Sequence, residues 1–178
     1  MDAKTAKVDV EPKALLSDEM DLYQMKKAAL QLLSSDALFD ASVKSTTQIY
    51  PLIKDGLKKV YILPEQTRAQ EVVFGNDYLI TFHSDNTVNT KVKIHPSSVS
   101  VKFREEGVNT NEPMREQHSH FPETGDLFTV TDVCNLMLYQ SKANWKQHTI
   151  ISQNYISIWN CDANQMITIP KGGGEDKK

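Results

Sequence analysis

The residues best suited to chemistry are two histidines separated by a single residue, His118-Ser-His120. If the backbone is extended there, both imidazoles project to one side, where a metal ion could bind them. Glu116, Glu123 or Cys134 could complete such a site. Zinc sites, however, are usually marked by paired ligands in two clusters, and this sequence has no second cluster. We therefore expect exposed loop histidines, and the sequence predicts no metal ligand and no cofactor.

Cations gather in one stretch, Val88 to Arg104, which contains four Lys or Arg residues and no acid. Two alternating runs in it indicate the strands of one hairpin, with cations on one face and aliphatic side chains on the other. The water-facing side would then present Lys91, Lys93, His95, Lys102 and Arg104. These residues are candidate contacts for single-stranded or double-stranded nucleic acid, through its phosphates. The alternative is an ordinary solvated sheet face, which shows the same alternation.

Two cysteines, Cys134 and Cys161, lie far apart in no paired motif, which argues against a disulfide scaffold. Cys134 is expected to be buried on a helix face, and Cys161 to be exposed and unreactive beside Asp162. The chain has no nucleophile elbow, P-loop, dinucleotide-binding turn or His-Glu-x-x-His helix. The sequence therefore predicts no catalytic residue and leans away from an enzyme. A hydrolytic or metal-dependent enzyme would gain support from a stoichiometric ion in the native protein.

The composition is that of an ordinary globular protein, with 39% hydrophobic and 24% charged residues in 178. A net charge of −3 provides no global positive field, so any nucleic-acid binding must come from a local patch. No signal peptide and no run of roughly 20 apolar residues is evident, which favours a cytoplasmic or nuclear protein without a transmembrane segment.

Periodicity in the sequence alternates between that of helices and that of strands. Helical spacing predicts helices from Ser17 to about Ser34, over Ile49–Val60, and from Thr131 to about Ser141. Spacing of two predicts strands at Glu71–Phe74, Asp77–His83, Val88–His95, Ser98–Phe103, Leu127–Val130, Thr149–Trp159 and Met166–Ile169. The polar stretch from Glu105 to Gly125 is expected to be an irregular loop.

This order predicts an α+β fold, in which a mainly antiparallel sheet of about six strands, a central meander plus a C-terminal hairpin, packs against about three helices. We expect one domain over residues 14–170, a flexible arm over 1–13 and a flexible tail over 171–178. The favoured function is a non-catalytic assembly or protein-interaction subunit that binds itself or another protein. Its candidate interface is the C-terminal hairpin, with Tyr155, Trp159, Ile167 and Ile169.

Overall fold

A computed structural model describes residues 14–40, 47–66, 71–102 and 114–172. The described residues form helices α1 (Ser17–Ser35) and α3 (Val130–Tyr139) and the strands β1 (Thr47–Lys54), β2 (Leu57–Pro64), β3 (Glu71–Gly75), β4 (Tyr78–Phe82), β5 (Val88–Lys93), β6 (Ser98–Lys102), β7 (Met114–Ser119), β8 (Trp145–Ile151), β9 (Tyr155–Asn160) and β10 (Gln165–Pro170). The predicted arm and residues 173–178 of the predicted tail lie outside the described part. The α+β class is confirmed, with more strands and fewer helices among the described residues than we expected.

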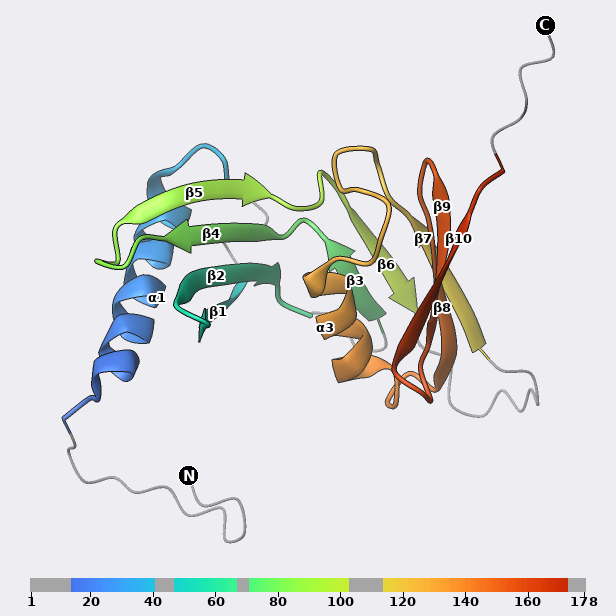
Figure 1. The fold of residues 1–178 in the computed structure, drawn as a ribbon, viewed down its shortest axis with the longest axis horizontal. Helices are drawn as coiled ribbons and strands as arrows, with labels where there is room; N and C mark the ends of the chain where they lie inside the picture. The colour runs from blue at the N-terminus through green and yellow to red at the C-terminus, as the bar shows by residue number, and fades with distance from the viewer. Residues whose placement is uncertain (1–13, 41–46, 67–70, 103–113, 173–178) are drawn as a thin grey trace, which may run out of the picture.

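The first half of the fold is an antiparallel sheet in the order β1-β2-β4-β5, here named the N-terminal sheet. Helix α1 lies along one of its faces (Figure 1). Met25, Ala29 and Leu33, spaced four residues apart, form the buried stripe of this helix. They pack against alternate residues of β2 and β4, including Val60 and Ile80, so this core is one helix on one sheet.

The predicted helix over Ile49–Val60 is wrong, because these residues form the β1–β2 hairpin. Asp55 and Gly56 stand at its turn with φ of 51° and 73°, the left-handed conformation of a two-residue hairpin loop. The alternate exposure along β1 is that of a strand with one covered face. Apolar residues at helical spacing coincided here with a strong Asp-Gly turn signal, and the turn decided the structure.

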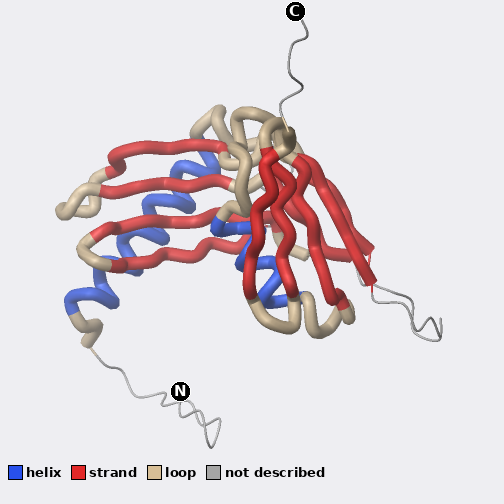
Figure 2. Tube along the Cα trace, turned by 45° about the vertical axis from the view of Figure 1, so that its right-hand side comes forward, coloured by secondary structure: helices blue, strands red, loops and turns tan. Residues whose placement is uncertain are grey.

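The second half contains a mixed sheet in the order β10-β9-β8-β7, the C-terminal sheet, and a two-stranded sheet of β3 and β6, the small sheet (Figure 2). Helix α3 lies beside both and contributes Leu136 to a second core. The other members of that core are Val72, Phe74, Val101, Ala143, Trp145, Trp159 and Cys161. Strand β7 pairs with β8 in parallel, so α3 belongs to the crossover that joins them.

Several strand predictions need correction. The strands at residues 71–102 exist, but β5 pairs with β4 and β6 pairs with β3, so the basic run is no hairpin. Thr149–Trp159 is interrupted by a turn and contributes to β8 and β9, whereas Leu127–Val130 forms no strand.

Among the described residues no helix is long and apolar enough to cross a membrane. Both cysteines are free.

Candidate metal centre

Four buried side chains converge where the two halves of the fold meet: His95, His118, His120 and Asp132, here named the His3Asp cluster. One donor atom from each lies within 4.8 Å of the other three. The Nε2 atom of His120 lies 3.1 Å from that of His118 and 3.4 Å from that of His95. Asp132 lies 3.3 Å from His120, 3.5 Å from His95 and 3.6 Å from His118, measured between its carboxylate oxygens and their Nε2 atoms.

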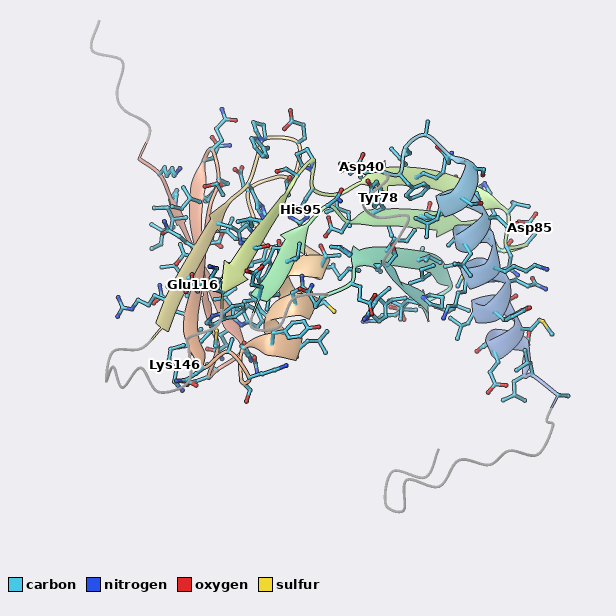
Figure 3. All side chains as sticks on the ribbon, turned by 180° about the vertical axis from the view of Figure 1, so that it is seen from behind. Asp40, Tyr78, Asp85, His95, Glu116 and Lys146 are labelled. Carbon is cyan, nitrogen blue, oxygen red and sulfur yellow. The ribbon has the colours of Figure 1, made fainter. Side chains whose placement is uncertain are left out.

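Three separate elements supply the cluster. His118 lies on β7 and His120 just beyond its end, so strand alternation turns both imidazoles inward. Asp132 lies in the first turn of α3, and His95 lies in the link between β5 and β6, which Figure 3 places at the junction of the two halves. The predicted loop at Glu105–Gly125 is therefore wrong for the stretch that forms β7, and its two histidines are buried rather than exposed.

Asp132 is held in place by the start of its own helix. The Thr129 hydroxyl accepts a hydrogen bond from the Asp132 backbone N–H at 3.1 Å, and Asp132 Oδ2 accepts from the Thr129 backbone N–H at 2.9 Å. This reciprocal arrangement is a capping box. The other oxygen, Asp132 Oδ1, is buried without a hydrogen-bond partner among the described residues. Capping thus orients the carboxylate, with Oδ2 near His95 and His120 and Oδ1 near His118.

Each histidine of the cluster also has a partner for its second ring nitrogen. His95 Nδ1 lies 2.7 Å from the buried carboxylate of Asp77, and His120 Nδ1 lies 3.2 Å from the carbonyl oxygen of Gly125. Both partners are acceptors, so these two rings carry the proton on Nδ1 and, when neutral, direct a lone pair from Nε2 into the cluster. His118 Nδ1 lies 2.8 Å from His148 Nε2. Such outer partners are typical of metal-binding histidines.

Electrostatics favour a cation at this point. Burial lowers the pKa of His118 to about 4 and that of His148 to about 3, so both imidazoles are neutral. Burial would also lower the pKa of His95, but its hydrogen bonds to Asp132 and Asp77 outweigh burial and raise the pKa to about 9. Burial would raise the pKa of Asp132, but hydrogen bonds to His120 and His95 hold it well below its usual range. A divalent ion that took the place of the His95 proton would compensate the negative charge of the buried Asp132 carboxylate.

A cavity of about 110 Å³, the access pocket, adjoins the cluster. Its lining includes His95 and His118 together with apolar Phe74, Val99 and Phe121. Its lining also includes the hydroxyl-bearing residues Ser97, Ser98, Ser119 and Thr124. Among the described residues the lining contains no Lys, Arg, Asp or Glu. The cluster is therefore buried, and it adjoins a pocket that combines apolar residues with a few polar groups, as small-molecule binding sites do.

The structure divides the residues predicted to form one basic face. Lys91 and Lys93 lie on β5 and form ion pairs with Asp36 and Asp40. Lys102 is exposed on β6, in a different sheet, and Arg104 lies outside the described residues. His95 was predicted to face water, which is wrong, because it is only 6% exposed. The chain leaves the period of two after Lys93, since the turn between β5 and β6 rotates His95 inward.

The candidate interface residues also fall in two classes. Ile167 and Ile169 are 59% and 48% exposed on β10, the outermost strand of the C-terminal sheet, and Tyr155 is half-buried. Trp159 is buried in the second core.

The cysteine predictions are reversed, because Cys161 is buried and Cys134 is only partly so. Burial, reinforced by Asp162, raises the pKa of the Cys161 thiol to about 11.

Periodicity in the sequence indicated two parts of the cluster but not that they lie close together. It predicted that His118 and His120 would share one side of an extended segment, and that a helix would begin near Asp132. What it lacked was the crossover from β7 through α3 to β8, which brings the end of the strand to the start of the helix. His95 carries no sequence signal for this role, because only the pairing of sheets brings it there.

Comparison of the chain with protein-family models, with curated proteins and with solved structures gives no match.

Proposed function

We propose that this protein is a metal-dependent hydrolase that binds one Zn²⁺ ion at the His3Asp cluster. The observation that carries the proposal is the convergence of three imidazole nitrogens and a carboxylate, all buried, within 4.8 Å of one another. Without a cation, the buried Oδ1 atom of Asp132 lies 3.6 Å from the His118 Nε2 atom and has no hydrogen-bond partner among the described residues. Buried polar groups are rarely left in such an arrangement.

The donor set supports zinc. Imidazole nitrogen and carboxylate oxygen bind Zn²⁺ at about 2.0–2.2 Å. Donors at that distance in tetrahedral geometry stand about 3.3 Å apart. Five of the six residue pairs have donor atoms 3.1–3.6 Å apart, with Asp132 measured from Oδ2 to His95 and His120 and from Oδ1 to His118. The separations therefore suit a metal of this size.

The choice of donors favours a catalytic ion over a structural one. Structural zinc sites are usually rich in cysteine, whereas catalytic sites use histidine and carboxylate and keep a position for substrate or water. The described donors here are nitrogen and oxygen, and two of the four residues line the access pocket. Zinc bound at such a site polarises a carbonyl group and lowers the pKa of a coordinated water.

The lining of the access pocket favours an uncharged acyl compound, an amide or an ester with an apolar substituent. Phosphate and sulfate esters would call for cationic side chains, which are missing from the lining among the described residues. In the hydrolysis the water oxygen bonds to the carbonyl carbon, and the bond to the leaving nitrogen or oxygen breaks. One proton of the water remains with the acid and the other passes to the leaving group.

Metal analysis of the purified native protein tests the first half of this proposal. We expect about one equivalent of zinc per chain, and less than a tenth of that in His120→Ala. His83→Ala is the matched control, because His83 is exposed and outside the cluster, and it should retain the ion. A protein that takes up no zinc after dialysis against the metal, or a His83 variant that loses it equally, would disprove the site.

Hydrolysis of chromogenic substrates tests the second half. We expect the zinc-loaded protein to cleave p-nitrophenyl butyrate or leucine p-nitroanilide and to leave p-nitrophenyl phosphate intact. Removal of zinc with 1,10-phenanthroline should abolish the rate, and added zinc should restore it. Equal rates in the wild type and in His120→Ala would show that the cleavage does not depend on the cluster.

Self-association is a second, independent candidate. It is favoured by the exposed Ile167 and Ile169 side chains on the outermost strand of a sheet. Nucleic-acid binding through Lys91, Lys93 and Lys102 stays a prediction, with weaker support because two of these cations already pair with aspartates.

A further inference from the structure

We infer that the substrate of the proposed hydrolase is a polypeptide in extended conformation, which adds as a further strand to the free edge of β6 and enters the access pocket. This inference rests on the proposed function and deepens it by naming the substrate class. Main-chain pairing of this kind recognises an extended peptide through its backbone and obtains specificity from pockets for alternate side chains.

The hydrogen bonds of β3 show which backbone groups of β6 face away from it. Val73 and Ser100 lie opposite each other in the antiparallel pair. The Val73 N–H donates to Gln66 Oε1 at 2.6 Å, and the Val73 carbonyl accepts from Gln66 Nε2 at 3.1 Å, so Val73 directs both groups away from β6. Directly opposed residues in such a ladder exchange both hydrogen bonds or neither. The N–H and C=O of Ser100 therefore point away from β3, and alternation gives Ser98 and Lys102 the same direction.

The two edges of the small sheet differ. Side chains close the β3 edge, because Gln66 binds both backbone groups of Val73 and Asn135 Nδ2 donates to the same carbonyl at 3.1 Å. On β6, Ser98 and Ser100 are exposed, and their backbone groups form no outward hydrogen bond among the described residues. Unpaired backbone donors and acceptors in a row are the template that an added strand requires.

The open edge of β6 leads into the access pocket. Ser98 and Val99, the first two residues of the strand, line this pocket. His95 and His118 of the His3Asp cluster line it as well. A peptide that pairs with Ser100 and Ser98 therefore extends into the pocket and presents one of its carbonyl groups to the cluster. A strand positions a bound substrate more precisely than a loop does.

The pocket selects one side chain of the peptide. Phe74, Val99 and Phe121 offer it apolar contacts. A cavity of about 150 Å³ can hold benzene, so the access pocket, at about 110 Å³, suits an aliphatic side chain such as that of leucine. Thr124 also lines the pocket, and its Oγ1 atom is buried without a hydrogen-bond partner among the described residues. A polar group of the peptide backbone could satisfy this hydroxyl.

Substrate length provides the first test. The water oxygen bonds to the peptide carbonyl carbon, the C–N bond breaks, and the second water proton passes to the released amine. Ser100 lies two residues beyond Ser98, roughly 7 Å along the strand, so a single amino acid in the pocket does not reach it. We expect the zinc-loaded protein to cleave an internally quenched octapeptide, with one central leucine between threonines and valines, with a kcat/KM at least tenfold above that for leucine p-nitroanilide. Equal values for the two substrates would overturn the inference.

A proline variant locates the peptide on β6. Ser100→Pro removes an outward N–H and no bond to β3, which is a position where edge strands tolerate proline. We expect it to lower kcat/KM for the octapeptide at least tenfold while the protein still binds one equivalent of zinc. Ser100→Ala is the matched control, because it keeps the N–H, and it should cleave the octapeptide like the wild type. Equal rates in the two variants would overturn the inference.

NMR of the wild-type protein gives a readout that depends neither on cleavage nor on a variant. The ¹⁵N-labelled, zinc-loaded protein is titrated with the octapeptide in which a CH₂–NH group replaces the peptide bond after leucine. The amides of Ser98, Ser100 and Lys102 should shift and exchange more slowly with deuterated water, whereas that of Asp85, in the turn between β4 and β5, should not change. A Ser100 amide unchanged at saturating peptide would overturn this inference and leave the metal site standing. A protein that binds no zinc would instead overturn the proposed function.

Discussion

Asp77 holds His95 through Nδ1, the ring nitrogen that does not face the cluster. Its carboxylate accepts hydrogen bonds from the His95 backbone N–H at 3.1 Å and from Nδ1 at 2.7 Å, and its backbone carbonyl accepts from Ile94. Asp77 is 1% exposed and lies just before β4, so it connects the N-terminal sheet to the cluster. It touches no other member of the cluster in these contacts and therefore acts through His95, as a positioning residue.

We expect Asp77→Asn to weaken metal affinity about 10–100-fold, because a neutral amide polarises the imidazole less and holds its tautomer less firmly. Competition with a chromophoric zinc chelator measures the change. Asp85→Asn is the control, since Asp85 is exposed and its hydrogen bonds among the described residues are with Thr87 in its own turn. Unchanged metal affinity in Asp77→Asn would mean that the Asp77 carboxylate does not contribute to metal binding by His95.

Gly75 packs closely against the link between β5 and β6, which carries His95. Its φ is +81°, and a Cβ atom there would meet the Ser97 carbonyl oxygen at 2.2 Å and the Cβ of His95 at 3.2 Å. We expect Gly75→Ala to lower the free energy of unfolding by roughly 1–3 kcal/mol, through backbone strain and displacement of this link. Metal affinity should fall with it, whereas Gly56→Ala, in the open turn of β1 and β2, should leave that affinity unchanged. Chemical denaturation and chelator competition measure the two effects.

Single residues show the limits of prediction from this sequence. His118 and His120 could be assigned to one side of an extended segment, because strand alternation is a local rule. Their burial could not, since the neighbouring residues are polar and the burial comes from the packing of three elements that are not adjacent in sequence. His95 was assigned by alternation to the wrong environment, because a turn after Lys93 ended the strand first.

At the scale of elements, the start of α3 serves two purposes. Thr129 caps the helix and holds Asp132, and Asp132 in turn offers an oxygen to the cluster. A helix start also favours a carboxylate electrostatically. Stability of the helix and affinity for the metal are therefore coupled through one hydroxyl.

We expect Thr129→Ala to lower the free energy of unfolding by about 1 kcal/mol, as for other helix caps. It should also lower metal affinity, because the Asp132 carboxylate loses the hydrogen bond from the Thr129 hydroxyl, although it keeps that from the Thr129 backbone N–H. Thr129→Ser keeps the hydroxyl and should restore both quantities. Thermal unfolding with and without zinc, for each variant, separates the two effects, and a serine variant that behaves like alanine would contradict the coupling.

Elements with a strong local signal were predicted well. The first helix, the last helix, four central strands and the C-terminal hairpin were recognised from periodicity and turn residues. The β1–β2 hairpin was missed because its apolar residues also satisfy helical spacing, and β7 was missed because Arg-Glu-Gln-His-Ser has no apolar alternation. Which strands pair with which depends on long-range packing, and so the division into three sheets could not be predicted.

At the scale of the whole molecule, the proposed metal would join the link after β5, the end of β7 and the start of α3. Zinc that binds only the folded chain should stabilise it by about 4 kcal/mol when its free concentration is a thousandfold above the dissociation constant. For a chain of this size, the melting temperature should then fall by roughly 10 °C on chelation. Differential scanning calorimetry measures this, and a chelator that shifts His118→Ala as much as the wild type would argue against it.

The exposed β10 edge makes a separate prediction about assembly. If the chain self-associates through this strand, Ile167→Lys should reduce the sedimentation coefficient at high concentration to that of a monomer. Leu57→Lys is the control, because Leu57 is equally exposed, at 59%, near the turn of the β1–β2 hairpin. A wild-type chain that sediments as a monomer at every concentration would exclude the assembly.

Strand β7, helix α3 and strand β8 run in a single crossover, and His118, His120 and Asp132 all come from its first half. A nascent chain therefore completes the His95 end of the centre well before the ribosome has made the other three donors. The gap from His95 to His118 is 23 residues and that from His120 to Asp132 is 12, so closing the longer loop costs only about 0.6 kcal/mol more, and the four donors meet only when the link after β5 docks on the crossover. Metal capture and docking of the two halves should consequently be one late event in folding.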